Sequence, residues 1–182
     1  IGFVGVGLMG HGIAKNLIAK GYPVTLRLHR NRAVADDLFK AGAKEAASYT
    51  ALAQGSDIVI LCVTGAPQVE EVMLGEDGIA SGARKGLIVV DTSTSEPATT
   101  QRMRELLAEK GVRFVDAPLA RSAVEAEQGR LNIMVGADDA TFAELAGTTP
   151  GVPQDGRSIV PLLRGEDVRW VRNLLIEWQG RN

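Results

Sequence analysis

The chain has 182 residues, of which 45% are hydrophobic and 23% are charged, and its formal net charge is −2. This length suits one domain, and the hydrophobic content excludes a disordered chain. The near-zero charge gives no long-range attraction to nucleic acid or to an anionic membrane, so neither is expected as a partner. The single cysteine, Cys62, cannot form an internal disulfide, which favours a reducing compartment and a cytoplasmic location.

Short apolar runs alternate with amphipathic stretches through the first three quarters of the chain. Apolar residues at helical spacing stop at Gly21 and at Gly42, so two helices are predicted to end at these glycines. Pro97 predicts the start of another helix, with Ser95 or Thr94 as its N-cap. Strands alternating with helices at this spacing predict an α/β fold with a doubly wound, mostly parallel Rossmann-type sheet. In chain order, the expected strands are 1–7, 23–30, 57–63, 86–94, 112–118 and 130–136, and the expected helices are 8–21, 34–42, 67–74 and 96–111.

The alternation stops near residue 146, where prolines become frequent. We therefore expect a nucleotide-binding domain over 1–142 and a short, atypical C-terminal segment over 143–182. Periodicity leaves the end of this segment open between a helix and a strand. One face of a helix would carry Val171, Leu174, Leu175 and Trp178, whereas the short apolar run NLLIEW favours a strand.

Gly5, Gly7 and Gly10 form a GxGxxG pattern between the first predicted strand and the first predicted helix. In a dinucleotide-binding turn the first glycine permits the turn, the second lets backbone approach a pyrophosphate, and the third lets helix pack close to strand. The pyrophosphate then meets free N–H groups at the positive end of the helix dipole. The strand and helix on either side favour dinucleotide binding over an ordinary turn.

The end of the second predicted strand favours NADP over NAD. An acidic residue about 20 positions past the glycines would bind a ribose 2′-hydroxyl. Here the stretch from His29 to Arg32 has no acid, and the first carboxylate is Asp36. A guanidinium at Arg30 suits a 2′-phosphate, which it can bind in a bidentate manner. The alternative is that Arg30 and Arg32 are solvated loop residues.

Other candidate residues follow the central strands, at the carboxyl edge where ligands of such sheets bind. Thr92, Ser93 and Thr94 can contact the nicotinamide side of a cofactor, cap the next helix, or do both. Cys62 is interpreted as a small buried hydrophobe, because no histidine lies near it in the sequence. His11 lies too near the expected phosphates for a general base.

Several motifs in order resemble the β-hydroxyacid dehydrogenase family, which includes 3-hydroxyisobutyrate dehydrogenase and tartronate semialdehyde reductase. They are IGFVGVGLMGHGIAKNL, the Arg30–Asn31 turn, DIVILCVTGAPQVEEVMLGEDGI, GLIVVDTST, GVRFVDAP and GRLNIMVGADDATF, within residues 1 to about 142. The resemblance implies a nicotinamide cofactor, a small 3-hydroxy acid substrate, no metal and a possible homo-oligomer. The cofactor-lining residues that it implies are Gly5, Gly7, Leu8, Met9, Gly10, Arg30, Asn31, Val63 and Thr94.

The substrate half departs from the family pattern. The family's loop reads DxPVSGG, whereas this chain reads DAPLARSA, which puts Ala120 at the serine and Arg121 at a glycine. Ser122, two positions later, is the candidate substrate-binding residue, and Arg121 can pair with a carboxylate. The family's proton-transfer lysine lies beyond the cofactor domain, but no lysine follows Lys110. An arginine holds its proton too tightly to replace it.

Residues from about 141 onward resemble a late, structural segment of type I sulfatases, with the text DGRSIVPLLRG, but no sulfatase nucleophile motif is present. Three hypotheses follow. The chain is the NADP-binding domain of a 3-hydroxyacid dehydrogenase completed by another chain, a nucleotide-binding module without turnover, or a hybrid of two proteins. The resemblance to the family favours the dehydrogenase domain, and the missing lysine favours the module without turnover.

Overall fold

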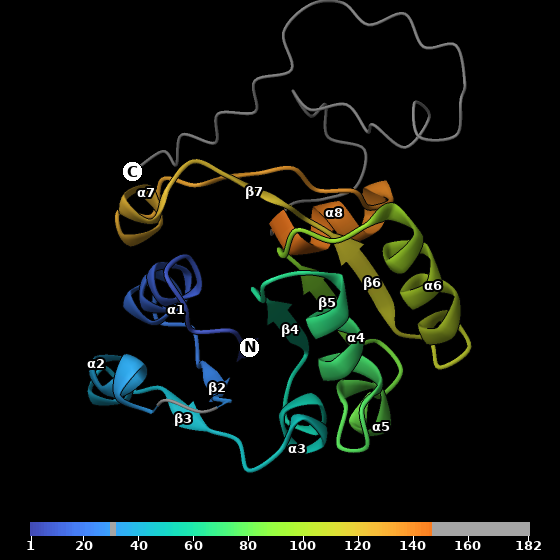
Figure 1. The fold of residues 1–182 in the computed structure, drawn as a ribbon, viewed down its shortest axis with the longest axis horizontal. Coiled ribbons are helices and arrows are strands. Elements are labelled where there is room, and N and C mark those ends of the chain that lie inside the picture. Colours follow the sequence, from blue (N-terminus) through green and yellow to red (C-terminus); the bar gives the residue numbers. More distant parts are fainter. Residues whose placement is uncertain (30–31, 147–182) are drawn as a thin grey trace, which may run out of the picture.

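The computed structural model describes residues 1–29 and 32–146. Six parallel strands form one sheet, and helices pack on both of its faces (Figure 1). The predicted α/β doubly wound fold is thereby confirmed. The strands are β1 (Gly2–Val4), β2 (Thr25–Arg27), β3 (Lys44–Glu45), β4 (Ile58–Leu61), β5 (Ile88–Asp91) and β6 (Arg113–Asp116), with β7 (Leu119–Ala120) and β8 (Asn132–Ile133) in a separate pair. The helices are α1 (Gly10–Ala19), the 3₁₀ turn η1 (Ala33–Ala35), α2 (Asp36–Lys40), α3 (Tyr49–Gln54), α4 (Ala66–Leu74), α5 (Ile79–Gly82), α6 (Pro97–Ala108), α7 (Ala123–Glu127) and α8 (Asp139–Ala146).

The strand order is β3-β2-β1-β4-β5-β6, which reverses direction between β1 and β4. This is the order of dinucleotide-binding sheets, and ligands bind outside the carboxyl ends of the strands at the reversal. The last residues of five neighbouring strands are paired with one another at that edge. They are Arg27, Val4, Leu61, Asp91 and Asp116. The loops that follow these five residues are therefore neighbours in space.

Alternation along the strands supplies a separate core on each face of the sheet. Phe3 and Leu26 point to the side of α1 and α2, where they pack with Leu38. Val59 and Leu61 point to the opposite side, among residues of α3 to α6. Each of these five side chains is at most 1% exposed, and burial of one such side chain contributes roughly 1.5–3 kcal/mol.

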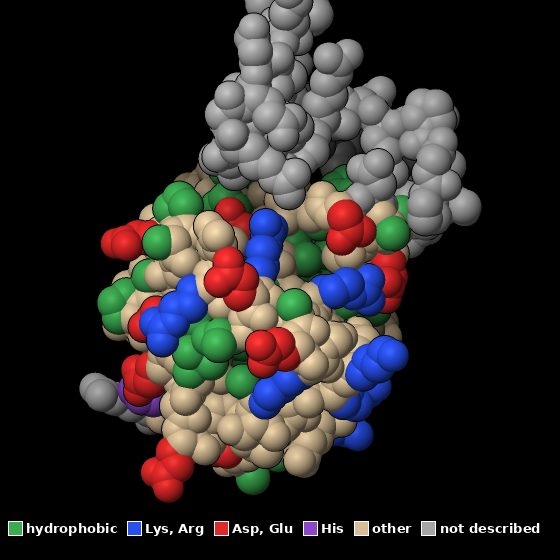
Figure 2. Space-filling view, turned by 90° about the vertical axis from the view of Figure 1, so that its right-hand side faces the viewer, with side chains coloured by type: hydrophobic (Ala, Val, Ile, Leu, Met, Phe, Trp, Pro, Cys, Tyr) green, Lys and Arg blue, Asp and Glu red, His purple; other side chains and the backbone are tan. Residues whose placement is uncertain are grey.

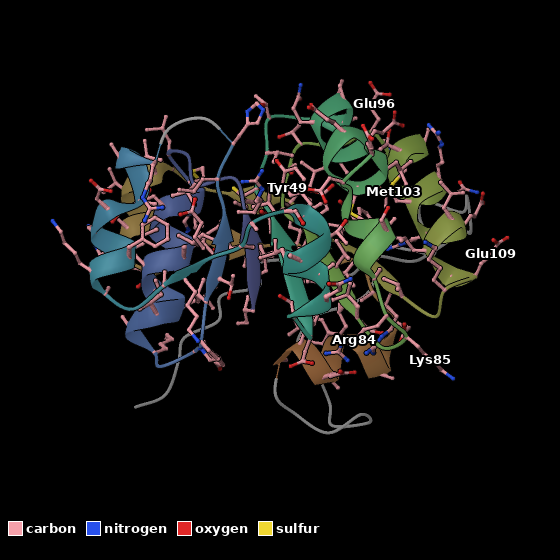
Figure 3. The ribbon with its side chains drawn as sticks, turned by 90° about the horizontal axis from the view of Figure 1, so that it is seen from below. Tyr49, Arg84, Lys85, Glu96, Met103 and Glu109 are labelled. Carbon is pink, nitrogen blue, oxygen red and sulfur yellow. The ribbon has the colours of Figure 1, made fainter. Side chains whose placement is uncertain are left out.

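The outer surface of α6 is solvated. Figure 3 shows Met103 pointing from α6 toward the interior, while Glu109 points outward beyond its end. On the face seen in Figure 2, acidic and basic side chains are interspersed and hydrophobic side chains form only small patches. An ion pair joins Arg102 of α6 to Glu70 of α4, with 2.8 Å between nitrogen and oxygen. No extended apolar surface is visible there.

Several features differ from the sequence-based expectation. Residues 130–136 do not extend the parallel sheet, because β8 pairs antiparallel with β7 beyond the end of β6. The short helices α3 and α5 were not predicted, since each is too brief to show a helical period. Ser95 and Thr94 do not cap α6, whose N-cap is Glu96 without a side-chain bond. The expected helix-ending glycines Gly21 and Gly42 do have positive φ angles of 85° and 108°.

The described part of the chain ends with α8, which runs through residue 142 and buries Ala143 completely. The domain boundary near residue 142 stays a prediction. The helix-or-strand question for Val171, Leu174, Leu175 and Trp178 lies outside the described residues. Among residues 1–29 and 32–146, no helix has the length and apolar character needed to cross a bilayer.

Candidate functional site

The turn between β1 and α1 is built on a left-handed glycine. Gly5 has a φ of +96°, which a residue with a side chain rarely adopts. The Gly7 amide donates to the Gly5 carbonyl oxygen at 2.9 Å, and the His11 amide donates to the Gly7 carbonyl oxygen at 2.9 Å. These two bonds fold the chain sharply from the strand into the helix.

The three glycines of the turn have different steric surroundings. A Cβ atom at Gly5 would lie 2.2 Å from the Cys62 carbonyl oxygen, and one at Gly10 would lie 2.0 Å from the Gly5 carbonyl oxygen. A Cβ atom at Gly7 would meet nothing within 4 Å. Gly5 and Gly10 are therefore needed for packing of the turn, whereas Gly7 presents bare backbone to open space.

The open side of the turn carries hydrogen-bond donors at the start of α1. Within the described chain, the amides of Leu8, Met9 and Gly10 have no backbone acceptor. The N-cap residue Met9 supplies no side-chain cap, and no acidic side chain lies in the first turn of α1. The partial positive charge at this helix end is thus left for an external anion. The Leu8 side chain is 85% exposed beside these amides.

The loops after β4 and β5 lie side by side at the same edge. A Cβ atom at Gly65 would lie 3.5 Å from the Thr94 carbonyl oxygen. The Val63 amide donates to the Ser93 Oγ at 3.0 Å, which ties the two loops together. Thr94 is exposed. Because α6 has no side-chain cap, capping is no longer an explanation for the hydroxyls of residues 92–94.

Cys62 packs among the hydrophobic residues between the sheet and α1, as the buried-hydrophobe interpretation expects. Burial raises the pKa of its thiol, so the sulfur stays protonated at neutral pH. A protonated, half-buried thiol at this position is a packing group and a poor nucleophile.

The end of β2, where adenosine ribose is recognised in such folds, is described only in part. Arg30 and Asn31 lie outside the described residues. Arg32 forms an ion pair with Glu45 of β3, and its guanidinium lies 4.4 Å from the ring centre of Phe39. Arg32 is thus held by its own neighbours.

The predicted substrate residue Ser122 is the N-cap of α7. Its Oγ accepts a bond from the Val124 amide at 3.3 Å and also bonds the Glu125 carboxylate, and Glu125 bonds the Ser122 amide in return. This reciprocal arrangement is a capping box. Arg121, just before it, has a φ of +84°, a conformation that favours glycine, and glycine is the residue that the family motif has at this position.

Sequence reasoning missed a charged cluster that joins three helices. His11 Nδ1 lies 2.5 Å from Glu127 Oε1, and its Nε2 lies 3.0 Å from Asp37 Oδ2. Lys15 Nζ donates to Glu127 Oε2 at 2.8 Å. Burial lowers the pKa of His11, but the bonds to Glu127 and Asp37 outweigh it and raise the pKa above its ordinary value. Glu127 follows His11 by 116 residues, and no local pattern announces this contact.

The same helices approach closely at Gly12. A Cβ atom there would lie 2.4 Å from the Ala126 carbonyl carbon, so α1 and α7 touch backbone to backbone. The Asn16 Nδ2 donates to the Ala126 carbonyl oxygen at 3.0 Å. These contacts place the Ser122 segment beside the helix that carries the glycine turn. Figure 1 shows α7 next to α1 and β7 crossing beyond the arrowhead of β6.

The family model for the NAD binding domain of 6-phosphogluconate dehydrogenase matches residues 1–148. The chain belongs to this family. The match covers the glycine turn, all six strands of the sheet and α8. It identifies the described part of the chain as a nicotinamide-dinucleotide-binding domain, in agreement with the Rossmann-type strand order.

Several of the similar proteins are named as dehydrogenases or reductases. The 2-hydroxy-3-oxopropionate reductase of Escherichia coli is 37% identical over 142 residues, covering 78% of this chain and 48% of the reductase. The structure of 3-hydroxyisobutyrate dehydrogenase from Salmonella typhimurium is 31% identical, with a TM-score of 0.73 over 80% of this chain and 50% of the other. A structure of Psf3 in complex with NADP+ and 2-OPP is 27% identical, with a TM-score of 0.73 over 90% of this chain and 60% of the other.

The chain spans about half the length of these relatives. The resemblance to hydroxyacid dehydrogenases, drawn from the motifs, is confirmed over the nucleotide-binding domain. The sulfatase-like interpretation of residues beyond 141 gains no support from these relatives, and those beyond 146 lie outside the described structure.

Proposed function

We propose that this chain binds NADP(H) at its glycine turn and is the cofactor-binding domain of an oxidoreductase acting on a small 3-hydroxy acid. The supporting observation is the turn itself. Backbone amides at Leu8, Met9 and Gly10 have no acceptor within the described chain, and the space over Gly7 is open. A pyrophosphate supplies the acceptors and the negative charge that this helix end lacks.

The preference for NADP over NAD rests on the end of β2. No carboxylate stands between His29 and Arg32 to bind a ribose 2′-hydroxyl. Arg32 is engaged by Glu45 and Phe39, so we assign the 2′-phosphate to Arg30, with Asn31 beside it. The structure of Psf3, which is 27% identical, contains NADP+.

The substrate class is proposed from the relatives and from the Ser122 segment. 2-Hydroxy-3-oxopropionate and 3-hydroxyisobutyrate, named for two relatives, both have an oxygen on the carbon β to a carboxylate. A substrate carboxylate would take the place of Glu125 at the Ser122 hydroxyl, or pair with Arg121. We therefore propose a 3-hydroxy acid, with its carboxylate near the start of α7.

Cofactor choice is tested by titrating the chain with NADPH and with NADH while following nicotinamide fluorescence. NADPH is expected to bind at least tenfold more tightly, since a guanidinium–phosphate pair is a strong, charge-assisted contact. Arg30→Ala should weaken NADPH binding and leave NADH binding unchanged. Arg32→Ala, the matched control, should leave the ratio of the two affinities unchanged. Tighter binding of NADH by the unaltered chain would overturn the NADP assignment.

We further propose that these 182 residues bind the cofactor without oxidising a hydroxy acid by themselves. No lysine follows Lys110 in these residues to act as the proton-transfer group that the family resemblance implies. The alternative is turnover with an acid/base group from another chain. The test is an assay of the purified chain with NADP+ and 3-hydroxyisobutyrate or glycerate. Turnover by this chain alone would contradict the proposal.

A further inference from the structure

Asp91, at the carboxyl end of β5, is a fully buried carboxylate without a cationic partner in the described chain. Its exposed fraction is 0%. No ion pair of the described residues includes it, and the adjacent Asp116 makes its surroundings more acidic. Burial, and then the charge of Asp91, raise the pKa of Asp116. Burial of a polar group is costly unless it is hydrogen-bonded, so the contacts of Asp91 need an explanation.

Those contacts hold the loop that follows β5. Asp91 Oδ1 accepts the Ser93 amide at 2.9 Å, and Oδ2 accepts the Ser95 hydroxyl at 2.6 Å. When an aspartate side chain accepts the backbone amide of the residue two positions later, it fixes a tight local turn. The intervening Thr94 is thereby held outward at the sheet edge, where it is exposed.

Asp91 is connected to the neighbouring loop through Ser93. The Ser93 side chain, which is 3% exposed, accepts the Val63 amide through its Oγ at 3.0 Å. Val63 follows β4, which pairs with β5 in parallel register. Asp91, Ser93 and Val63 form a continuous connection from the buried carboxylate to the loop that faces the reversal of the sheet.

The place of these loops indicates which half of the dinucleotide they meet. In this strand order the adenosine ribose is recognised after β2 and the pyrophosphate lies at the β1–α1 turn. The second nucleotide half must then lie across the ends of β4 and β5. Figure 1 shows these two strands side by side.

We propose that Asp91 is a positioning residue for the nicotinamide half of the cofactor, because it orders the loops that carry Val63 and Thr94. This inference rests on the proposed NADP(H) binding. It assigns no catalytic role to Asp91, which is buried away from any ligand. A carboxyl group at this position can accept both the Ser93 amide and the Ser95 hydroxyl.

The experiment compares two ligands on the full chain. NADPH has both nucleotide halves, whereas adenosine 2′,5′-bisphosphate lacks the nicotinamide half. Asp91→Ala is expected to weaken NADPH binding about tenfold or more, because it removes a buried hydrogen-bond network, and to change bisphosphate binding less than about twofold. Asp91→Asn is expected to restore NADPH binding to within about threefold, because its amide can still accept the Ser93 N–H.

Asp138→Ala is the matched control. Asp138 makes the same kind of contacts, to the Thr141 amide at 2.9 Å and the Thr141 hydroxyl at 2.8 Å, at the start of α8. Its loss should leave both affinities unchanged. Should Asp91→Ala not fold, Ser93→Ala must show the same selective loss. The inference would be overturned if either variant lowered the affinities for NADPH and for the bisphosphate equally, or lowered neither affinity. An unaltered chain that binds neither ligand would instead overturn the proposed function, and the inference with it.

Discussion

Gly7 and Gly10 lie three residues apart in the glycine turn, yet an added methyl group would meet different surroundings at each. At Gly10 it would press on the Gly5 carbonyl oxygen, and at Gly7 it would enter open space. Gly10→Ala should therefore lower the free energy of unfolding by about 2–3 kcal/mol. Gly7→Ala should change it by less than about 0.5 kcal/mol, but weaken NADPH binding roughly tenfold by blocking approach of the pyrophosphate.

Denaturant unfolding and fluorescence titration of the two variants separate stability from binding. Gly21→Ala, at a helix end away from the turn, has a positive φ and is the control for glycine strain alone. Unchanged NADPH affinity in Gly7→Ala would remove the steric argument for this glycine.

Arg121 has a side chain where the backbone conformation favours glycine. Arg121→Gly should raise the free energy of unfolding by about 1 kcal/mol, since an L-residue with positive φ costs about 1–2 kcal/mol. Ala120→Gly, one residue earlier in β7, should lower it by about 0.5–1 kcal/mol. Chemical denaturation of both variants measures the difference. A loss of stability in Arg121→Gly would mean that the arginine side chain contributes more than its backbone costs.

At the scale of elements, His11 links α1 to α2 and α7 and should make their packing depend on pH. Its pKa in the folded chain is raised, so the stabilisation is fully present below the ordinary value of 6.5 and is lost as pH rises through the folded value. Hydrogen bonds to Lys15 and then to His11 lower the pKa of Glu127. The hydrogen bond to His11 lowers the pKa of Asp37. Their contribution is lost as pH falls through the folded values. The cluster should stabilise most between about pH 4.5 and 6.5.

Thermal unfolding of the unaltered chain at pH 5.5 and pH 8.5, compared with His11→Gln, tests this dependence. The variant should lose most of the difference in melting temperature between the two pH values. His29→Gln, which replaces the exposed second histidine, should keep the difference. An identical pH response in His11→Gln and the unaltered chain would exclude His11 as its source.

At the scale of the whole molecule, the β7–β8 pair presents apolar side chains to solvent. Ile133 of β8 is 42% exposed and Met134, directly after β8, is 46% exposed, whereas the face in Figure 2 carries interspersed acidic and basic side chains. We expect the chain to self-associate through this pair, since exposed apolar area favours association. Light scattering should show an average mass that rises with concentration. The double variant Ile133→Lys and Met134→Lys should stay monomeric, and a strictly monomeric unaltered chain would contradict the expectation.

The strand-helix alternation, the glycine turn and the helix-ending glycines were predictable from the sequence because they follow from local rules. Side-chain periods of 2 and 3.6 and the freedom of glycine at positive φ need only neighbouring residues. The same locality explains the errors. Residues 130–136 have a strand composition, but they run antiparallel, pairing with β7 and bridging from Gly136 to Asp116 of β6, because of where the chain passes after Pro118. The short α3 and α5 are stabilised by packing against each other and the sheet, and a period cannot be read from so few residues.

The connection from Asp91 to Val63 and the His11 cluster were decided by the tertiary structure. Asp91 reads as the end of a strand, and only the register of β4 and β5 places Ser93 against the Val63 amide. His11 meets Glu127 because Gly12 lets α1 and α7 touch. Sequence alone determined that a dinucleotide-binding turn forms, since its conformation is local. Which distant polar groups surround that turn depends on the packing of helices on the sheet, and packing joins residues that no short pattern relates.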